Sequence, residues 1–335
     1  VEFRRSAPKG LIKRNFAKFA HMLVFRSLQN PMRAHLGSIR RNSTIAGTIY
    51  YRINYHDPSR LALVCPHEDV KWSFADLWVN VQQVAGGLKN LGYYPGSIVA
   101  SDLGNSVSNL LLQFAAAHNG MQVLSVKSKD EFDYLSAQIP ISGAVMTSSS
   151  SFLSGELFDI KSVDAAGVRG LSGKAGEGAT DRNVDHAYYS SENATSTREV
   201  YLYGVGTAGL LETKPDDQVC VATSLNSAYG MGMVVSAIVR SASVYLPDMA
   251  NLDLGDSTIL LTESQHVKSL EDAVKSSSKI RGGIVKVANG YDVLGTPGNP
   301  AQSEVGGVQF FTLGEAEPCF RPLFNACVDK YYSYK

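Results

Sequence analysis

Short apolar runs alternate with longer amphipathic runs between residues 44 and 127, a pattern typical of strands that alternate with helices. The pattern predicts strands at Leu61–Cys65, Ile98–Ser101 and Gln122–Val126, and helices at Phe74–Leu91 and Asn109–His118. Strands joined by helices of this length run parallel, because the crossover returns the chain to the same end of the sheet. The sequence therefore predicts an α/β fold with mixed, largely parallel sheets covered by helices.

The same kind of pattern returns after residue 186. It is found at Val219–Thr223, Val234–Arg240, Val244–Leu246, Thr258–Leu261 and Gly283–Ala288, with a polar helix over Ser264–Ser276. Between the two halves, residues 147–185 are rich in Ser, Gly and Asp, and the runs Ser148–Ser151 and Gly170–Gly178 offer little to bury. We expect this segment to be a flexible connection or an exposed insertion.

Residues 1–43 differ from the rest in charge. Ten Lys and Arg residues lie in the first 41 positions against a single acid, Glu2. One helical stripe carries Ile12, Phe16, Phe19 and Leu23, and Pro31 is expected to end that helix. We interpret residues 1–43 as a basic arm that contacts a partner protein or an anionic lipid surface. A targeting remnant and an ordinary packed helix are the alternatives.

Composition narrows the classes of function. The chain has 335 residues, 44% of them hydrophobic, and a formal net charge of zero, so it can bury a large core and has no overall attraction to nucleic acid. Its cysteines have neither zinc-ligand nor disulfide-framework spacing, which predicts a reducing compartment and no metal site; they are Cys65, Cys220, Cys319 and Cys327. No apolar run approaches the roughly 20 residues that span a bilayer. A chain that starts at Val1 is compatible with removal of a targeting segment, and equally with a terminus that begins further upstream.

The stretch Asp57–Gly120 carries five short features in a fixed order, at Leu61–Val64, Trp72–Leu77, Ala85–Gly92, Pro95–Ser97 and Leu103–Asn105. In this order they resemble the opening of an adenylate-forming domain, the family of acyl-CoA synthetases and their relatives. The resemblance implies that these features are scaffold, and that the ancestral activity is an ATP-dependent acyl-CoA ligase. It extends over about residues 44–320.

The segment Tyr189–Val200 reads Tyr-Ser-Ser-Glu-Asn-Ala-Thr-Ser-Thr-Arg-Glu-Val. It is similar to the nucleotide loop of that family, Tyr-Thr-Ser-Gly-Thr-Thr-Gly-x-Pro-Lys-Gly-Val. The resemblance assigns Ser190, Ser191, Thr195 and Arg198 to a degenerate form of this loop, with Arg198 in the place of the loop lysine.

All three loop glycines are replaced, by Glu192, Thr195 and Glu199. Such a loop holds polyphosphate through bare backbone N–H groups, often at φ angles that only glycine adopts at low cost. Side chains obstruct that approach, and two carboxylates repel a triphosphate. We expect no ATP binding in the ancestral manner and no cofactor.

Two further landmarks are altered. The family's Pro-Leu-Phe-His-x-x-Gly corresponds to Ser224–Gly230, where Ser227 replaces the histidine. Its Tyr-Gly-x-Thr-Glu corresponds to Leu313–Glu317, where Glu317 is either a cation ligand or a solvated surface group. Because the chain ends at Lys335, the resemblance also implies that the C-terminal domain with its catalytic lysine is absent.

Other motifs give no function. Gly204–Gly209 matches GxGxxG, but the acid expected about 20 residues on is missing and Pro215 interrupts the following region, so we expect a glycine-rich turn. The histidines lie in unrelated contexts and no serine lies in a GxSxG elbow, so a hydrolase is unsupported; they include His56, His67, His118, His186 and His266. His118 is interpreted as a core or helix-end residue. The aromatic tail Tyr331–Lys335 suits docking on a partner or packing on its own domain.

These observations favour a pseudoenzyme in three parts: a basic arm at 1–43, a degenerate adenylate-forming-like domain at 44–320 and an aromatic tail at 321–335. It resembles the accessory subunits of enlarged mitochondrial assemblies in protists. We expect a non-catalytic subunit in the mitochondrial matrix or on the matrix face of the inner membrane, with ATP synthase or a respiratory complex favoured over the ribosome. The alternative is an acyl-CoA or nucleotide-binding protein, or a residual acyl-CoA ligase.

Overall fold

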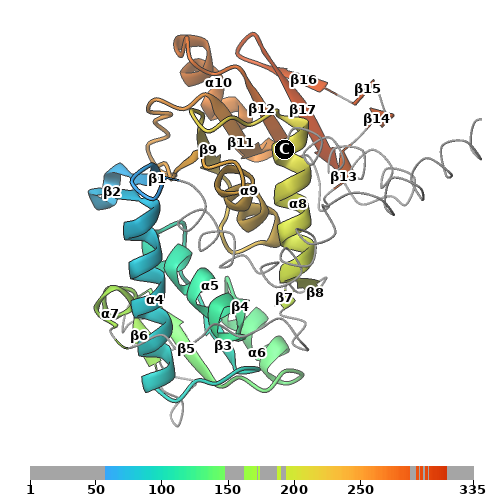
Figure 1. The fold of residues 1–335 in the computed structure, drawn as a ribbon. Coiled ribbons are helices and arrows are strands. Elements are labelled where there is room, and N and C mark those ends of the chain that lie inside the picture. The colour runs from blue at the N-terminus through green and yellow to red at the C-terminus, as the bar shows by residue number, and fades with distance from the viewer. Residues whose placement is uncertain are drawn as a thin grey trace, which may run out of the picture. The chain divides into compact units, whose positions relative to one another are not determined.

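The structure is a computed structural model that describes residues 57–147, 162–171, 173, 187–189, 194–286, 292–293, 295–296, 299–300 and 302–314. In these residues the strands form a large sheet, a smaller sheet and an isolated pair, β14 (Gly295–Thr296) with β15 (Asn299–Pro300). Helices flank both sheets (Figure 1). The predicted α/β class, with mixed and largely parallel sheets, is confirmed. The basic arm and the aromatic tail lie outside the described residues.

The large sheet has the order β13-β17-β12-β11-β9-β10-β1-β2, and β16 pairs with β17. Its strands β1, β10, β9, β11, β12 and β17 are parallel, whereas β2, β13 and β16 are antiparallel to their neighbours. Their bounds are β1 Leu61–Cys65, β2 Val70–Ser73, β9 Gln218–Ala222, β10 Ser243–Tyr245, β11 Ile259–Glu263, β12 Gly282–Lys286, β13 Asp292–Val293, β16 Gln302–Val305 and β17 Val308–Gly314. A short 3-10 helix, η1 (Pro66–Glu68), connects β1 to β2.

The small sheet has the order β6-β5-β3-β4-β7-β8, parallel except for the hairpin of β7 and β8. Its strands are β3 Ile98–Ser101, β4 Gln122–Ser125, β5 Gly143–Met146, β6 Ser162–Asp164, β7 Ala187–Tyr189 and β8 Ala194–Ser196. The helices are α4 Phe74–Asn90, α5 Val107–Asn119, α6 Lys129–Ser136, α7 Ala165–Gly170, α8 Thr197–Leu210, α9 Ala228–Ile238 and α10 Ser264–Ser276.

Residues 162–170 lie within the segment expected to be a flexible insertion, and for them that expectation is wrong. They form β6, which pairs with β5, and α7, whose Val168 is fully buried in the main core. The pairing of β6 with β5 and the burial of Val168 anchor this segment, although its composition is largely polar. Most of the remaining predicted insertion lies outside the described residues.

The alternation of side chains along the strands divides the core into layers. In β9, Val219 and Val221 face the same core as the helices α4, α5, α8 and α9, while Cys220 faces a second core with α10. In the small sheet, Val99 joins the helices of the main core and Ala100 faces a third core with α6. Both sheets thus contribute one face to a shared apolar core that contains these four helices.

Local capping explains where the two best-predicted helices begin and end. The α4 helix starts at a capping box in which Asp76 N–H donates to Ser73 Oγ at 3.1 Å and Ser73 N–H donates to Asp76 Oδ2 at 2.9 Å. The α5 helix is capped by Ser106 and ends at Gly120, whose φ of 72° suits glycine. The periodicity located both helices, and the serine caps set their first residues.

The expected glycine-rich turn at Gly204–Gly209 is wrong, because these residues lie inside α8. Gly204 provides close helix packing instead of a turn. A Cβ on Gly204 would lie 2.5 Å from Val235 Cγ1 and 2.9 Å from the Gly232 carbonyl oxygen, both in α9. Gly204 therefore allows α8 and α9 to approach more closely than larger side chains permit, and no dinucleotide fingerprint is needed to explain it.

Candidate functional site

The described residues of the segment that resembles a nucleotide loop lie at the end of β7, in β8 and at the start of α8. Tyr189 pairs with Leu124 of β4 on one side and with Ala194 of β8 on the other. The backbone of Thr195 lies in β8 opposite Tyr188, and Arg198 lies in the first turn of α8. Ser190 and Ser191 lie outside the described residues, as do Glu192 and Glu317. The predicted segment thus forms the edge of the small sheet and leads directly into a helix.

In parallel α/β sheets, ligands bind beyond the carboxyl ends of the strands. Three strands of the large sheet run into polar residues there: Thr223 follows β9, Glu263 ends β11 and Lys286 ends β12. Thr223 Oγ1 donates a hydrogen bond to Glu263 Oε1, and Gln265 Nε2 donates to Glu263 Oε2 at 3.0 Å. The two carboxylate oxygens of Glu263 are thus both occupied by side chains of the chain itself.

Tyr229 packs against this edge. It is fully buried, its hydroxyl donates to the Thr262 carbonyl oxygen at 3.3 Å, and Lys286 Nζ lies 5.1 Å from its ring centroid. A lysine at this distance from an aromatic ring gains a cation–π attraction. One carboxylate and one ammonium therefore end adjacent strands at the edge where an α/β protein binds ligands.

The loops that follow β3 and β9 are tied to each other. Asn105 Nδ2 donates to the Thr223 carbonyl oxygen at 2.6 Å, and its Oδ1 accepts the Leu225 N–H at 2.8 Å. One side chain thereby satisfies an acceptor and a donor of the opposite loop's backbone. The Leu-x-Asn turn, which the resemblance assigned to scaffold, joins the two sheets.

A second amide pair strengthens this junction. Fully buried Asn109 donates through Nδ2 to Asn226 Oδ1 at 2.7 Å, and Asn226 Nδ2 donates in turn to the Leu103 carbonyl oxygen. Asn109 Nδ2 also lies 2.9 Å from the Gly104 carbonyl oxygen. Asn105, Asn109 and Asn226 were not identified as a group from the sequence, because Asn226 is more than 100 residues from the other two and meets them only in the fold.

We expect Asn105→Ala to lower the free energy of unfolding by about 2 kcal/mol. The substitution removes the two hydrogen bonds that the Asn105 amide makes with the Thr223 carbonyl oxygen and the Leu225 N–H. Asn80→Ala is the matched control. The Asn80 amide donates to the Asp76 carbonyl oxygen within its own helix, so we expect a change of about 0.5 kcal/mol or less. Urea unfolding of both variants measures the difference. Equal effects would show that the junction adds nothing to stability.

The altered Ser224–Gly230 landmark has a structural role in the fold. Ser227 caps α9, since its Oγ accepts the Gly230 N–H at 3.0 Å and donates to the Ser224 carbonyl oxygen at 2.9 Å. A Cβ on Gly230 would lie 2.0 Å from that same carbonyl oxygen. The glycine is thus required by the turn, and the serine in the place of histidine starts the helix.

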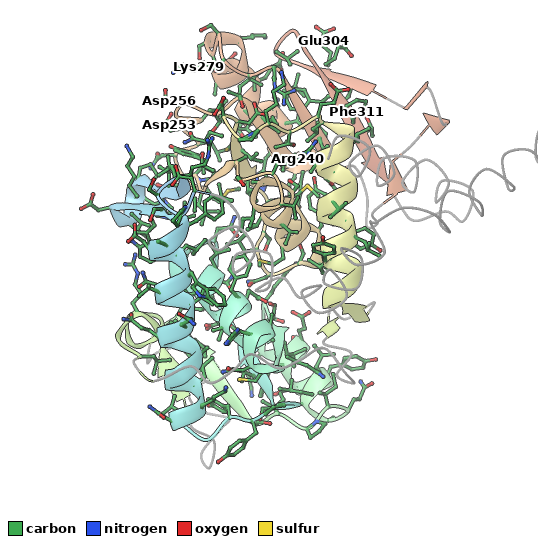
Figure 2. All side chains as sticks on the ribbon, in the orientation of Figure 1. Arg240, Asp253, Asp256, Lys279, Glu304 and Phe311 are labelled. Atoms are coloured by element: carbon green, nitrogen blue, oxygen red, sulfur yellow. The ribbon has the colours of Figure 1, made fainter. Side chains whose placement is uncertain are left out.

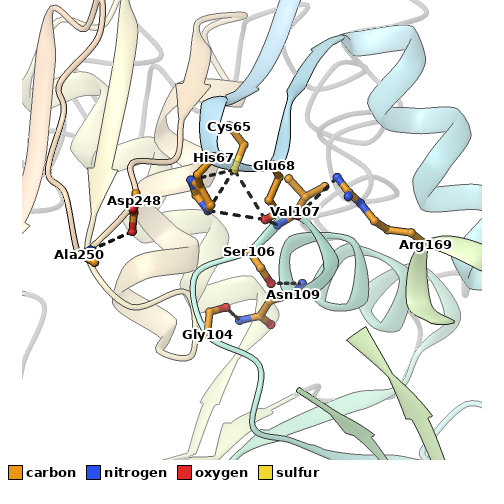
Figure 3. A network of polar contacts seen from close by, with 10 residues as sticks. All are labelled: Cys65, His67, Glu68, Gly104, Ser106, Val107, Asn109, Arg169, Asp248 and Ala250. Atoms are coloured by element: carbon orange, nitrogen blue, oxygen red, sulfur yellow. Dashed lines mark hydrogen bonds and ion pairs between the residues drawn. The ribbon is translucent and has the colours of Figure 1, made fainter. Parts of the chain in front are cut away.

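Of the histidines considered, His118 and His67 are informative. His118 lies in the last turn of α5, and its ring packs edge-on against Trp78 with centroids 5.4 Å apart, which confirms its interpretation as a helix-end residue. His67 lies beside Cys65 and Glu68 in the turn after β1 (Figure 3). Considering the cysteines and the histidines separately does not reveal this group, although Cys-Pro-His-Glu is contiguous at Cys65–Glu68.

The opposite, amino ends of the strands also carry paired charged groups, among them the nearly buried Asp217 with Arg281. Lys279 and Asp256, labelled in Figure 2, precede β12 and β11 and form an exposed ion pair. Exposed pairs of this kind contribute about 0–1 kcal/mol. Among the described helices, none combines the length and the apolar character needed to cross a membrane.

Comparison with known families gives a match to one segment near the start of the described residues. Residues 52–146 match the sequence model of the family described as AMP-binding enzyme. Comparison with curated proteins gave no match. The resemblance noted over Asp57–Gly120 is confirmed by the family match.

Solved structures extend the likeness to most of the chain. The Mycobacterium tuberculosis fatty acyl CoA synthetase is 14% identical with a TM-score of 0.62, over 75% of this chain and 55% of that one. The o-succinylbenzoate CoA synthetase of Bacillus subtilis, in complex with ATP and magnesium ion, is 15% identical with a TM-score of 0.60, over 74% and 55%. The Klebsiella oxytoca NpsA N-terminal subdomain, in complex with 3-hydroxyanthranilyl-AMSN, is 13% identical with a TM-score of 0.59, over 74% and 68%.

At these identities the likeness establishes the fold, which is that of the N-terminal domain of adenylate-forming enzymes. The chain spans 55% of the length of the first two of these structures. It spans 53% of another o-succinylbenzoate CoA synthetase complex. The fold is therefore similar to that of adenylate-forming enzymes, as the resemblance implied.

Proposed function

We propose that this chain is a non-catalytic, architectural subunit of a large mitochondrial assembly, built on an adenylate-forming scaffold. One observation carries the proposal. The segment Tyr189–Val200, whose described residues lie at the end of β7, in β8 and in the first turn of α8, retains none of the three glycines of the nucleotide loop that it resembles. Activation of a carboxylate by ATP needs the triphosphate held close to the backbone of this loop.

The replacements act against phosphate in two ways. A side chain at each former glycine disfavours backbone conformations at φ > 0 and is expected to obstruct the approach of phosphate oxygens to N–H groups. Two of the new side chains, Glu192 and Glu199, carry negative charge. Even at an effective dielectric constant of 20, like charges about 4 Å apart repel by about 4 kcal/mol. Together these effects oppose the binding of magnesium-ATP.

The carboxyl edges of the sheets support the same proposal. Asn105, Asn109 and Asn226 form hydrogen bonds with one another's loops, and Glu263 accepts hydrogen bonds from Thr223 and Gln265. Polar side chains that satisfy each other stabilise the junction between the sheets. This is the arrangement expected of a scaffold whose former ligand edge has become part of its structure.

Location and assembly rest on the basic arm. Residues 1–43 combine a surplus of Lys and Arg with one apolar stripe, a pattern suited to a partner's groove or an anionic lipid surface on the matrix side. The chain as a whole has no net charge, which favours a membrane complex such as ATP synthase or a respiratory complex over the ribosome.

A second candidate function is retained ligand binding: a protein that holds acyl-CoA or a nucleotide, or a residual acyl-CoA ligase. It is favoured by Glu263 and Lys286, which end adjacent strands at the edge where α/β sheets bind ligands. A cation and an anion side by side at this edge are suited to a polar ligand.

Calorimetric titration of the purified chain with magnesium-ATP, AMP and an acyl-CoA separates the two functions. We expect no heat of binding from either nucleotide, because of the obstructed loop. Saturable micromolar binding of ATP or AMP would overturn the pseudoenzyme. Binding of acyl-CoA alone would support a retained ligand pocket without adenylation.

The architectural role is tested by the size of the native particle. In an extract prepared from mitochondria with a mild detergent, the chain is expected to migrate with a complex many times its own mass of 36.1 kDa. Migration as a free monomer would contradict the proposal, whatever the titration gives.

A further inference from the structure

The turn that follows β1 brings three different metal-binding side chains together (Figure 3). Cys65 ends β1, and η1 supplies His67 and Glu68 after Pro66. Cys65 Sγ lies 3.6 Å from each ring nitrogen of His67 and 3.7 Å from Glu68 Oε1, and His67 Nε2 lies 3.9 Å from the same Glu68 oxygen. The three donor atoms therefore form a nearly regular triangle.

The size of that triangle fits one kind of ion. Zinc binds thiolate sulfur at about 2.3 Å and imidazole nitrogen or carboxylate oxygen at about 2.0–2.2 Å, in tetrahedral geometry. Neighbouring ligand atoms of such a tetrahedron are about 3.5 Å apart when one is sulfur and about 3.3 Å apart for nitrogen and oxygen. The pairs that include sulfur already match this spacing to within a few tenths of an ångström, and the third is longer. Because the sulfur is equally far from both ring nitrogens, the His67 ring must turn to bring one nitrogen lone pair toward the ion. We propose that Cys65, His67 and Glu68 form a site for Zn²⁺ or a similar transition-metal cation.

The surroundings of Glu68 hold it in place for this role. Its Oε1 accepts the Val107 N–H at 2.7 Å, at the start of α5, and its Oε2 lies 3.4 Å from a nitrogen of Arg169. A carboxylate oxygen accepts from two directions, so Oε1 binds the Val107 N–H and a cation together. Zinc sites usually have an outer shell of groups that hydrogen-bond to the ligand side chains and so fix their orientation, and Val107 and Arg169 take this place here.

Solvent reaches the three side chains from the side of His67 and Glu68. Cys65 is fully buried, whereas the side chains of His67 and Glu68 are 30% and 18% exposed, so the ion enters from solvent past His67 and a water takes the fourth position. On binding, the metal replaces the proton of the Cys65 thiol, which passes to solvent, and the sulfur binds as thiolate.

The test is a Co²⁺ titration of the full chain after treatment with a chelator. We expect one equivalent of Co²⁺ to produce tetrahedral visible bands and a sulfur-to-cobalt charge-transfer band in the near ultraviolet, both abolished by added Zn²⁺. The charge-transfer band must disappear in Cys65→Ala. If no such band forms, or if it persists in Cys65→Ala, the proposal is wrong.

Two surface variants keep the test decisive should Cys65→Ala fold poorly. His67→Ala and Glu68→Gln each remove one ligand, and we expect each to weaken Co²⁺ binding at least about tenfold. Glu68→Gln keeps an oxygen that accepts the Val107 N–H. The matched control His266→Ala removes a histidine of α10, remote from this turn in the sequence, and should bind Co²⁺ as the wild type does. Unchanged affinity in both ligand variants would overturn the site, and neither result depends on whether the chain binds ATP.

Discussion

Replacing Gly283 by alanine is expected to lower the free energy of unfolding by at least about 3 kcal/mol. Gly283 lies in β12, an interior strand of the large sheet, paired with Leu260 of β11 and Phe310 of β17. A Cβ at this position would lie 1.8 Å from the Leu260 carbonyl oxygen and 2.5 Å from a ring carbon of Phe310. Because the first of these atoms belongs to a backbone inside the sheet, it cannot move aside as a flexible side chain would.

The control for this variant is Gly104→Ala. A Cβ on Gly104 would meet no other atom within 4 Å, and the backbone there does not require glycine. We expect its replacement to change stability by no more than about 0.5 kcal/mol. Chemical unfolding of both variants, followed by circular dichroism, gives the comparison. A Gly283→Ala protein as stable as Gly104→Ala would mean that β11 and β12 separate at little cost.

This strand also bears on function, because β12 ends at Lys286 and β11 ends at Glu263. A variant that separates the strands displaces both charged ends. If the second candidate function is right, Gly283→Ala should also weaken acyl-CoA binding, whereas an architectural subunit would lose only stability and assembly.

The elements of the sheets were largely predictable from the sequence. Leu61–Cys65, Ile98–Ser101 and Ser264–Ser276 have the predicted bounds, since each is an uninterrupted apolar or amphipathic run next to a turn or cap signal. The prediction of a turn at Gly204–Gly209 failed, because glycine occurs both in turns and where helices pack closely. Gly204 and its neighbours signal a turn in isolation, but the space they leave is filled by Val235 of α9, which no local pattern reveals.

The candidate sites were less predictable, for two physical reasons. The amide junction joins Asn105 to Thr223 and Asn109 to Asn226 across more than 100 residues, so it exists only once both sheets have formed. The Cys65–Glu68 group is local, but its donors converge because η1 turns the chain immediately after β1. Spacing rules built on paired cysteines do not cover a cysteine followed by histidine and glutamate in a 3-10 turn.

Asp217→Asn is expected to lower the free energy of unfolding by about 2–4 kcal/mol, somewhat less than for a fully buried ion pair because Arg281 is 40% exposed. Asp217 is 7% exposed and accepts hydrogen bonds from Arg281 Nη2 at 2.8 Å and from Thr258 Oγ1 at 2.7 Å. It also accepts the Lys214 N–H at 2.6 Å. Because Asp217, Thr258 and Arg281 directly precede β9, β11 and β12, these bonds join the amino ends of the three strands. The amide keeps the shape but removes the charge that Arg281 pairs with.

The pH dependence of the stability loss in Asp217→Asn shows whether the loss comes from the missing charge. Burial raises the pKa of the Asp217 carboxyl, but the hydrogen bonds from Arg281, Thr258 and Lys214 outweigh this effect and lower the pKa below its usual value. A carboxyl whose folded pKa is lowered stabilises the fold above its unfolded pKa of about 4, and this contribution is lost as the pH falls through the folded value. The stability difference between wild type and Asp217→Asn should therefore be largest near neutral pH and should shrink in acid.

The neighbouring Asp216, 94% exposed in its pair with Arg60, provides the control, since Asp216→Asn should cost about 0.5 kcal/mol or less at any pH. A difference for Asp217→Asn that stays constant from neutral to acid pH would assign the loss to packing instead of to charge.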